Sequence, residues 1–419
     1  MKTNRVEQHR IKKGHKFFHI IDDLCWKSKN MYNYGNFIIR QEFVKTSREK
    51  EEGLREEANW IRYNTLFHMI KDSEPYKELG SNVGQATLRK LDKNWVSFFE
   101  ATKEYAKNPN KFLGRPKMPN YLPKENGRYE CSLDNNKFKV IDGYIYFCWK
   151  PLKIMNNTFM TNIPEGIKLM QIRLVPKNGE YILEVVYQIE VPDIEEKAER
   201  IASIDLGIDN LITITTNCGV APLVINGKPL KSINQYYNKK ISEMRAELKK
   251  RHNADWSKEM QRFTTKRNNK VDDYIQKATK MVIDFCKENN IDTLVCGYNT
   301  GWKQESDMGK RVNQKFVDIP HASIVWRLSY KCETAGILFK TPEESFTSGT
   351  SFLDGEEPIK ENYDKSRRVH RGLFVSNNGT KINADVNGSY QIMKKAFPNV
   401  FSDGIEGAGS HPIVVNIPL

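Results

Sequence analysis

The segment 201–216, IASIDLGIDNLITITT, constrains the fold of this chain most, because its two apolar, β-branched runs must be buried. Gly207 between the runs favours a bend, so the segment predicts a buried strand, a turn and a second strand. Asp205 would then lie at the open end of the first strand. A carboxylate in that place either accepts hydrogen bonds from the turn or takes part in chemistry.

A second aspartate stands at the start of a predicted helix near the end of the chain. In KINADVNGSYQIMKKAF (381–397), Asn383 is a residue type that caps helices, and apolar side chains recur at helical spacing from Val386 onward. Asp385 is therefore expected in the first turn of the helix. The helix dipole stabilises an anion there, which could be its whole role.

The first half of the chain divides into segments of different pattern. A basic start, residues 1–15, favours a strand, and residues 16–107 carry three apolar, aromatic-rich stripes at helical spacing, which predict a helical bundle. Residues 108–197 open with a stretch rich in Pro, Gly and Lys. Alternating runs follow around Asp-Gly at 142–143 and Asn-Gly at 178–179, which predict hairpins in a small antiparallel β-barrel or sheet.

Beyond a boundary near residue 197, the predicted order is three strands, helix, strand, helix, strand, loop and helix. This order requires a mixed α/β sheet, and an RNase H-like fold fits it. In such folds carboxylates from different strands and a late helix converge on two metal ions. The whole chain is thus expected to be a multidomain α+β protein.

The chain is basic, with 66 Lys and Arg against 52 Asp and Glu and a net charge of +14, and the excess extends over both halves. Such an excess is typical of a protein that encloses a polyanion, although it also serves solubility. The segment 228–270 has thirteen basic and four acidic residues. Its helix, about 231–252, is expected to present cations to phosphates or merely to solvent. The cations concerned are Lys231, Lys239, Lys240, Arg245, Lys249, Lys250 and Arg251.

The cysteine spacing and the hydropathy of the chain indicate its cellular compartment. The seven cysteines form no CxxC pair, the first residues lack an apolar leader, and no long apolar run occurs. We therefore expect a reduced, soluble, cytoplasmic protein without a membrane function.

Several ordered motifs resemble the TnpB proteins of bacterial insertion sequences, which are relatives of the compact type V CRISPR effectors. The motifs include SIDLGIDNL, GYNTGWKQ, NQKFVDIPH, ESFTSGTSFLDGE and INADVNGSYQIMKKAF, and the likeness extends into SEPYKELGSNVGQATLRKLDKNWVSFF in the first half. The resemblance implies an RNA-guided DNA endonuclease that binds a guide RNA derived from the transposon end. It also implies that the protein binds double- and single-stranded target DNA and recognises a short motif beside the target. The protein would act as a monomeric ribonucleoprotein in the bacterial cytoplasm, at the nucleoid.

The resemblance also implies a domain plan. A helical recognition domain (16–107) would be inserted in an N-terminal β-barrel or wedge domain (1–15 and 108–197). A RuvC nuclease domain (198–340 and 382–419) would follow, interrupted by a target-nucleic-acid-binding insertion (341–381).

The same resemblance assigns a metal site that cleaves phosphodiester bonds with magnesium or manganese. Asp205 and Asp385 match the first and last RuvC aspartates, but Gly297 and Tyr298 stand where many relatives carry a glutamate. Glu344, directly after the predicted strand GILFKT, is the expected substitute, ahead of the weaker candidates Glu343 and Glu305.

Three alternatives compete with an active TnpB-type endonuclease. If Glu344 lies in a surface loop, the site is impaired and the protein is an RNA-guided DNA-binding repressor. A compact type V CRISPR effector is a further alternative, whereas a protein-only RNase H-like resolvase poorly explains the residues before 197.

Zinc is not expected, because residues 341–385 contain no cysteine and His370 is their only histidine. The arginine cluster of this segment, Arg367, Arg368 and Arg371, could hold a phosphate or pair with Asp354, Glu356 and Glu357. Nucleic-acid contacts are also predicted for Lys303, Arg115 and Lys117, with a structural or linker role as the alternative. His321 is expected to cap or to pack.

Overall fold

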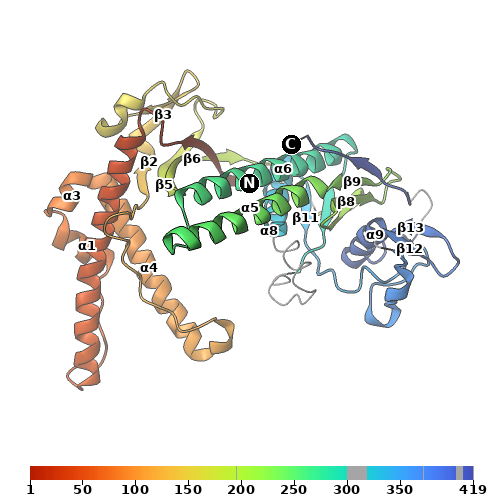
Figure 1. Ribbon diagram of the computed structural model, residues 1–419, viewed down its shortest axis with the longest axis horizontal. Helices are drawn as coiled ribbons and strands as arrows, with labels where there is room; N and C mark the ends of the chain where they lie inside the picture. The colour runs from red at the N-terminus through yellow and green to blue at the C-terminus, as the bar shows by residue number, and fades with distance from the viewer. Residues whose placement is uncertain (195, 300–318, 371, 403–408, 419) are drawn as a thin grey trace. The chain divides into compact units, whose positions relative to one another are not determined.

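The computed structural model describes residues 1–194, 196–299, 319–370, 372–402 and 409–418 (Figure 1). The chain forms two compact units. One comprises residues 2–190, and the other comprises Met1 and residues 191–419. Each unit combines helices with a β-sheet, so the expected multidomain fold with mixed α and β structure is confirmed.

Four helices occupy the segment of the N-terminal unit for which a bundle was predicted. They are α1 (Phe18–Glu51), α2 (Tyr63–Ile70), α3 (Glu74–Leu79) and α4 (Ser81–Lys107). The aromatic stripes form the core between them: Trp95 is fully buried, and its indole N–H donates to Asn36 Oδ1 at 3.0 Å. Aromatic residues here serve packing, as their helical spacing indicated.

The strands of this unit form an open four-stranded sheet and a separate hairpin. The sheet has the order β1 (Lys2–Ile11), β6 (Glu180–Glu190), β5 (Lys168–Lys177) and β2 (Cys131–Asp134), all antiparallel. The hairpin joins β3 (Phe138–Ile141) and β4 (Tyr144–Phe147). Both predicted turns are confirmed, since Asn178 and Gly179 have φ of 53° and 77°, and Asp142 and Gly143 have φ of 49° and 72°.

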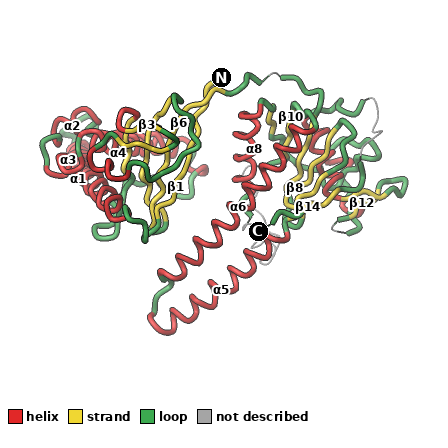
Figure 2. Tube along the Cα trace, turned by 90° about the horizontal axis from the view of Figure 1, so that it is seen from above, coloured by secondary structure: helices red, strands yellow, loops and turns green. Residues whose placement is uncertain are grey.

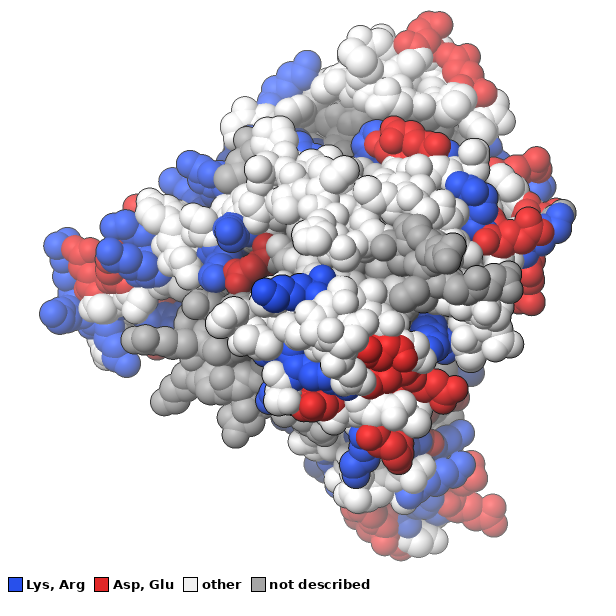
Figure 3. Space-filling model, turned by 90° about the vertical axis from the view of Figure 1, so that its right-hand side faces the viewer, with Lys and Arg blue, Asp and Glu red and all other residues white. Residues whose placement is uncertain are grey.

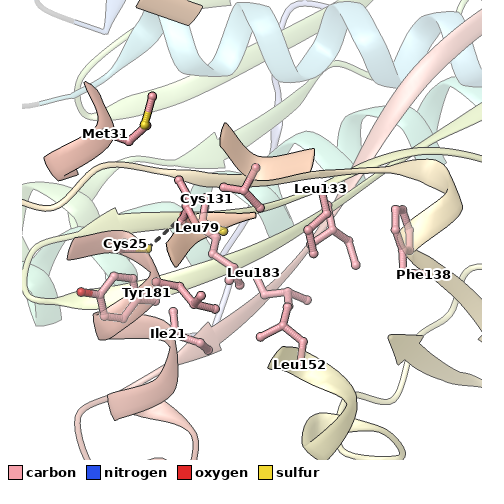
Figure 4. Packing of buried hydrophobic residues seen from close by; sticks show 14 of the residues in the cluster. Ile21, Cys25, Met31, Leu79, Cys131, Leu133, Phe138, Leu152, Tyr181 and Leu183 are labelled. Carbon is pink, nitrogen blue, oxygen red and sulfur yellow. Dashed lines mark hydrogen bonds between the residues drawn. The ribbon is translucent and has the colours of Figure 1, made fainter. Parts of the chain in front are cut away.

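The expected closed barrel is not formed by the described residues. β2 has only four residues, and β3 and β4 pair with each other instead of extending the sheet. β1 therefore keeps an outer edge. The buried face is covered by the helices, where Cys25 of α1 packs near Cys131 and Leu183 of the sheet (Figure 4). Covering one face with helices removes the need to close the sheet on itself.

The second unit contains a six-stranded mixed sheet. Its order is β11 (Leu338–Lys340), β10 (Thr293–Cys296), β7 (Ile201–Leu206), β8 (Asn210–Thr216), β9 (Leu223–Asn226) and β14 (Ile413–Val415). β7, β8 and β9 are antiparallel neighbours, whereas β10 and β11 run parallel to β7. β14, which pairs in parallel with β9, was not predicted from the sequence.

Helices cover both faces of this sheet. α6 (Lys258–Glu288) and α8 (His321–Ala335) pack on one face, against Ala202, Ile204 and Leu206. α9 (Ala384–Ala396) packs on the other, where Ile392 and Met393 meet Ile201 and Val295. A small hairpin, β12 (Leu373–Val375) and β13 (Lys381–Asn383), precedes α9.

The basic segment after β9 forms two helices where one was predicted. α5 (Lys228–His252) and α6 lie side by side as a long hairpin (Figure 2). Asn253, left-handed with φ of 47°, is the C-cap of α5, and Ser257 caps α6 by accepting from Met260 N. No helix within the described ranges is both long and apolar enough to cross a membrane.

Candidate functional site

Asp205 faces α9 because side chains alternate along a strand. Ile201 and Ser203 lie on that face of β7, and Asp205 has the same parity. Gly388 of α9 lies opposite, where a Cβ atom would come within 2.9 Å of Asp205 Oδ2. The absence of a side chain at Gly388 therefore lets the helix approach the carboxylate.

Asp385 lies in the first turn of α9, as its sequence predicted. The Asn383 side chain caps the helix, accepting from Asp385 N at 3.0 Å and from Val386 N at 3.2 Å. The two carboxylate oxygens of Asp385 have different partners. Oδ2 accepts from Asn210 Nδ2 at 2.7 Å, and Oδ1 accepts from Arg368 Nη2 at 3.0 Å.

Glu344 reaches the same end of the sheet from the chain that follows β11. Tyr298 N donates to Pro342 O at 3.1 Å, and Glu344 N donates to Asn299 Oδ1 at 3.0 Å, so this chain runs beside the continuation of β10. A Cβ atom at Gly297 would lie 2.8 Å from Glu344 Oε2. The carboxylate of Glu344 thus occupies space beside the position where the expected glutamate is missing.

Two of the three carboxyl groups, those of Asp205 and Glu344, have raised pKa values. Burial raises the pKa of Asp205 well above its ordinary range, and the charges of Asp385 and Glu344 raise it further, while Arg368 opposes them. Burial, together with the neighbouring charge of Glu343, raises the pKa of Glu344 to about 7, against the opposing charge of Lys395. Like charges in a half-buried site need either a proton or a cation.

Within the described ranges, no three His, Cys, Asp or Glu side chains already form a metal site. The guanidinium of Arg368 and the amide of Asn210 take the oxygens of Asp385 instead. The three acids nevertheless provide only oxygen donors, which hard divalent cations take as ligands.

A buried cluster of hydroxyl groups joins α9 to the sheet beneath these acids. Ser389 Oγ donates to Ser203 O at 2.9 Å and lies 2.9 Å from Thr215 Oγ1, and Ser203 Oγ lies 3.1 Å from Thr215 Oγ1. All three side chains are fully buried. Because Ser203 lies two residues before Asp205 and Ser389 four residues after Asp385, the cluster sets how the two aspartates face each other.

The cations predicted on α5 lie on a largely exposed helix, in which only Leu230 and Asn234 are buried. Lys239, Arg245, Lys249 and Lys250 are exposed. The remaining three form close ion pairs: Lys231 with Asp209, Lys240 with Glu243, and Arg251 with Glu247. The face of the molecule in Figure 3 carries basic and acidic groups intermixed around a broad uncharged area.

The arginines of the predicted cluster have different surroundings. Arg367 forms two hydrogen bonds with the Glu356 carboxylate, at 2.7 and 2.9 Å, and donates to Gly349 O and Asn362 O, so it holds the segment 349–367 together. Arg368 instead contacts Asp385. Arg371 lies outside the described residues.

The other predicted residues lie elsewhere. Arg115 and Lys117 are exposed in the segment between α4 and β2. Glu343 is exposed and 3.3 Å from Lys395, whereas Lys303 and Glu305 lie outside the described residues. His321 is buried with Nε2 3.1 Å from Gly207 O, which agrees with a packing role.

Sequence reasoning missed several residues that shape the site: Asn210, Gly388, Asn299 and the hydroxyl cluster. Asn210 and Gly388 stand inside the motifs SIDLGIDNL and INADVNGSYQIMKKAF, so their place in these motifs could have marked them as residues of the site. Asn299, Ser203 and Ser389 also stand inside quoted motifs, but their contacts join distant segments, and neither those contacts nor Thr215 could be predicted from the motifs.

Comparisons with known proteins match two parts of the chain to family models. Residues 184–303 match a family described as a probable transposase, OrfB_IS605, and residues 321–392 match the Cas12f1-like TNB domain. The TnpB-like protein ORF457 of Acidianus two-tailed virus is 24% identical over 387 residues, which cover 81% of this chain and 80% of the viral protein. The chain is thus similar to TnpB-like proteins, and the resemblance seen in its motifs is confirmed.

Two solved structures align with most of this chain. The Cas12f1–sgRNA–target DNA complex is 16% identical with a TM-score of 0.37, covering 93% of this chain and 98% of that chain. CasPhi-2 (Cas12j) bound to crRNA and phosphorothioate-DNA is 9% identical with a TM-score of 0.45, covering 98% and 93%. Neither TM-score reaches 0.5.

Proposed function

We propose that the protein is an RNA-guided DNA endonuclease of the TnpB type, which cuts target DNA in a RuvC site formed by Asp205, Glu344 and Asp385. The convergence of three carboxylates from β7, from the chain after β11 and from α9 is the observation that carries this proposal. The strand order of the sheet, with three antiparallel strands and two parallel ones beside β7, supports the RNase H-like assignment.

The donor set fits magnesium or manganese, because these cations take carboxylate oxygens as ligands and would offset the charges of Asp385 and Glu344, which raise the pKa of buried Asp205. When bound, such cations activate water and stabilise the leaving oxygen in phosphodiester hydrolysis. Asp205, Glu344 and Asp385 would be the ligands. A cation at this site would compete with Arg368 for Asp385 Oδ1, and with a proton for Glu344, whose pKa is raised to about 7.

Arg368 has a role that follows from this exchange. Its side chain is about one third exposed, so its guanidinium can turn from Asp385 to a phosphate of the substrate. Asn210 keeps its hydrogen bond to Asp385 Oδ2 and orients the carboxylate. The hydroxyl cluster below holds α9 and β7 together while the charges around them change.

The remaining parts of the chain have roles in holding nucleic acid. The exposed cations of α5 would contact phosphates by electrostatic attraction, which does not depend on the base sequence. We assign residues 16–107 to recognition of the guide and target, the sheet of the N-terminal unit to a wedge domain, and residues 341–381 to an insertion that contacts the target without zinc.

Cleavage by the purified ribonucleoprotein tests the proposal. The protein is expressed with the DNA that flanks its gene, the RNA that copurifies is sequenced, and a plasmid library with a matching target and randomised flanks is incubated with the complex in MgCl2. We expect linear plasmid, and none with Asp205→Asn, Asp385→Asn or an excess of EDTA.

Two other outcomes have different meanings. Tight, guide-dependent binding without cutting in either magnesium or manganese would contradict the nuclease and favour a repressor. Cutting that is lost with both aspartate variants but unchanged in Glu344→Gln would contradict only the third ligand.

A further inference from the structure

A cavity of about 310 Å³ lies between α5 and α6, away from the carboxylate site. It is lined by Ser232, Ile233, Tyr236, Tyr237, Phe263, Lys266, Arg267 and Lys270. Among the described residues, the lining thus combines aromatic rings with three cations and contains no acidic residue. We propose that this cavity, called the α5–α6 pocket, holds one unpaired nucleotide of the guide RNA; the inference rests on the proposed function.

The aromatic side of the pocket consists of packed rings, one of which is exposed to solvent. Phe263 lies nearly parallel to Tyr237, with ring centroids 5.6 Å apart, and meets Tyr236 edge-on at 5.9 Å. The Tyr237 hydroxyl lies 2.9 Å from Thr264 Oγ1, which fixes that ring. Tyr236 remains 60% exposed, so its ring has a free face. An exposed aromatic ring held on a rigid support is the kind of surface on which an unpaired base stacks.

The basic side of the pocket is available to an anion. Lys266 and Lys270 are exposed, one helical turn apart on α6, and neither has an ion pair or hydrogen bond with any described residue. Arg267, between them, lies over the Tyr237 ring at 5.2 Å and donates to Asn234 Oδ1. Arg267 therefore supports the aromatic wall, and the two lysines are left to hold phosphates.

RNA fits the pocket better than DNA does. Ser232 and Tyr236 line it together with the cations, and the hydroxyl group of each residue can bond to a ribose 2′-hydroxyl, which DNA lacks. The cavity is also too small for a duplex, whereas a base and its ribose need a volume of this order. A single nucleotide that leaves the stack of a folded RNA is the occupant that matches the volume, the rings and the charge.

The experiment measures binding of fluorescein-labelled r(A)12 and d(A)12 to the RNA-free full chain by fluorescence anisotropy, at several salt concentrations. Tyr236→Ala is expected to weaken r(A)12 binding about tenfold, the effect typical of losing one stacked base, while Tyr236→Phe keeps the stacking and loses only the hydroxyl. Trp326→Ala removes another exposed aromatic residue, 65% exposed on α8, and should change nothing.

The salt dependence separates the two sides of the pocket. Lys266→Ala should reduce the slope of log K against log salt by about 0.7, as expected for one phosphate contact on a single strand. Tyr236→Ala should leave the slope unchanged. Lys258→Ala, which removes an exposed cation from the same helix but outside the pocket, is the matched control.

A direct readout accompanies the affinities. An r(A)12 probe with one central 4-thiouridine is irradiated with the protein, and crosslinked peptides from α5 or α6 that contain Tyr236 or Phe263 are expected by mass spectrometry. If the wild type binds RNA but neither crosslinks there nor responds to Tyr236→Ala, the α5–α6 pocket does not hold a nucleotide, and the proposed function is unaffected. An equal loss for d(A)12 would overturn the choice of RNA, and no binding of RNA by the wild type would contradict the proposed function itself.

Discussion

Replacing Glu344 with glutamine should stabilise the metal-free protein at alkaline pH. The glutamine has the shape of a protonated glutamate but cannot ionise, so it removes the charge that burial disfavours. The pKa of Glu344 rises from an ordinary 4.5 to about 7 in the folded chain. A carboxyl group with a raised pKa contributes fully to stability below pH 4.5, and this contribution is lost as the pH rises through 7.

The magnitude follows from the two pKa values. One pKa unit corresponds to about 1.4 kcal/mol, so ionised Glu344 costs the folded protein about 3 kcal/mol at pH 8 and less than about 1 kcal/mol at pH 5. Glu344→Gln should therefore raise the free energy of unfolding by at most about 3 kcal/mol at pH 8, and by little at pH 5.

Hydrogen exchange in EDTA, followed by mass spectrometry on peptides from β7 and α9, measures this change in the C-terminal unit alone. At pH 8, exchange should slow by up to about a hundredfold relative to the wild type at the same pH. Glu357→Gln is the control, because Glu357 is exposed and its charge does not shift the pKa of Glu344, so that variant should gain no stability.

Metal should reverse the order of stability. Added MgCl2 should protect the wild type more than Glu344→Gln, because the variant has lost one anionic ligand. Exchange of Glu344→Gln at the wild-type rate at pH 8, or an equal difference at pH 5, would show that ionised Glu344 does not destabilise the fold. Equal protection by magnesium in both proteins would remove Glu344 from the ligand set.

Three further substitutions test the surroundings of the acids. Gly388→Ala puts a Cβ atom within 2.9 Å of Asp205 Oδ2, so Mn²⁺ affinity measured by calorimetry should fall at least about tenfold, equivalent to about 1.4 kcal/mol. Ser389→Ala leaves buried hydroxyl groups without their partner, and α9 should lose about 1–3 kcal/mol of stability in hydrogen exchange. Arg368→Gln frees Asp385 Oδ1 from an ion pair worth about 1 kcal/mol at most, so Mn²⁺ should bind a few-fold more tightly while cleavage slows.

The contrary results are equally specific. Alanine at Gly372, where a Cβ atom meets nothing within 4 Å, should leave Mn²⁺ affinity unchanged, and an equal fall there would show that the loss at Gly388 is not local. Unchanged exchange in Ser389→Ala would mean that the hydroxyl cluster does not hold α9. Weaker Mn²⁺ binding by Arg368→Gln would show that Arg368 supports the ligand and does not compete with the metal.

The local features of the chain could be predicted from its sequence. Turns at Asp142 and Asn178, the cap at Asn383 and the strands around Asp205 depend on neighbouring residues, whose backbone preferences and hydrophobic period are visible in one stretch of sequence. The positions of Asp205 and Asp385 on a strand and in a first helical turn follow from the same patterns. Their motifs added the chemistry that those positions suggest.

Contacts between distant segments were decided only by the tertiary structure. The sheet of the N-terminal unit stays open because β2 is short and helices cover one face, and β14 joins β9 from the far end of the chain. The Glu344 carboxylate lies beside Gly297 because β11 and β10 are parallel neighbours. The sequence by itself determined which charged residues were candidates for the site. The packing of α9, β7 and β11 determined which of those charged side chains lie together.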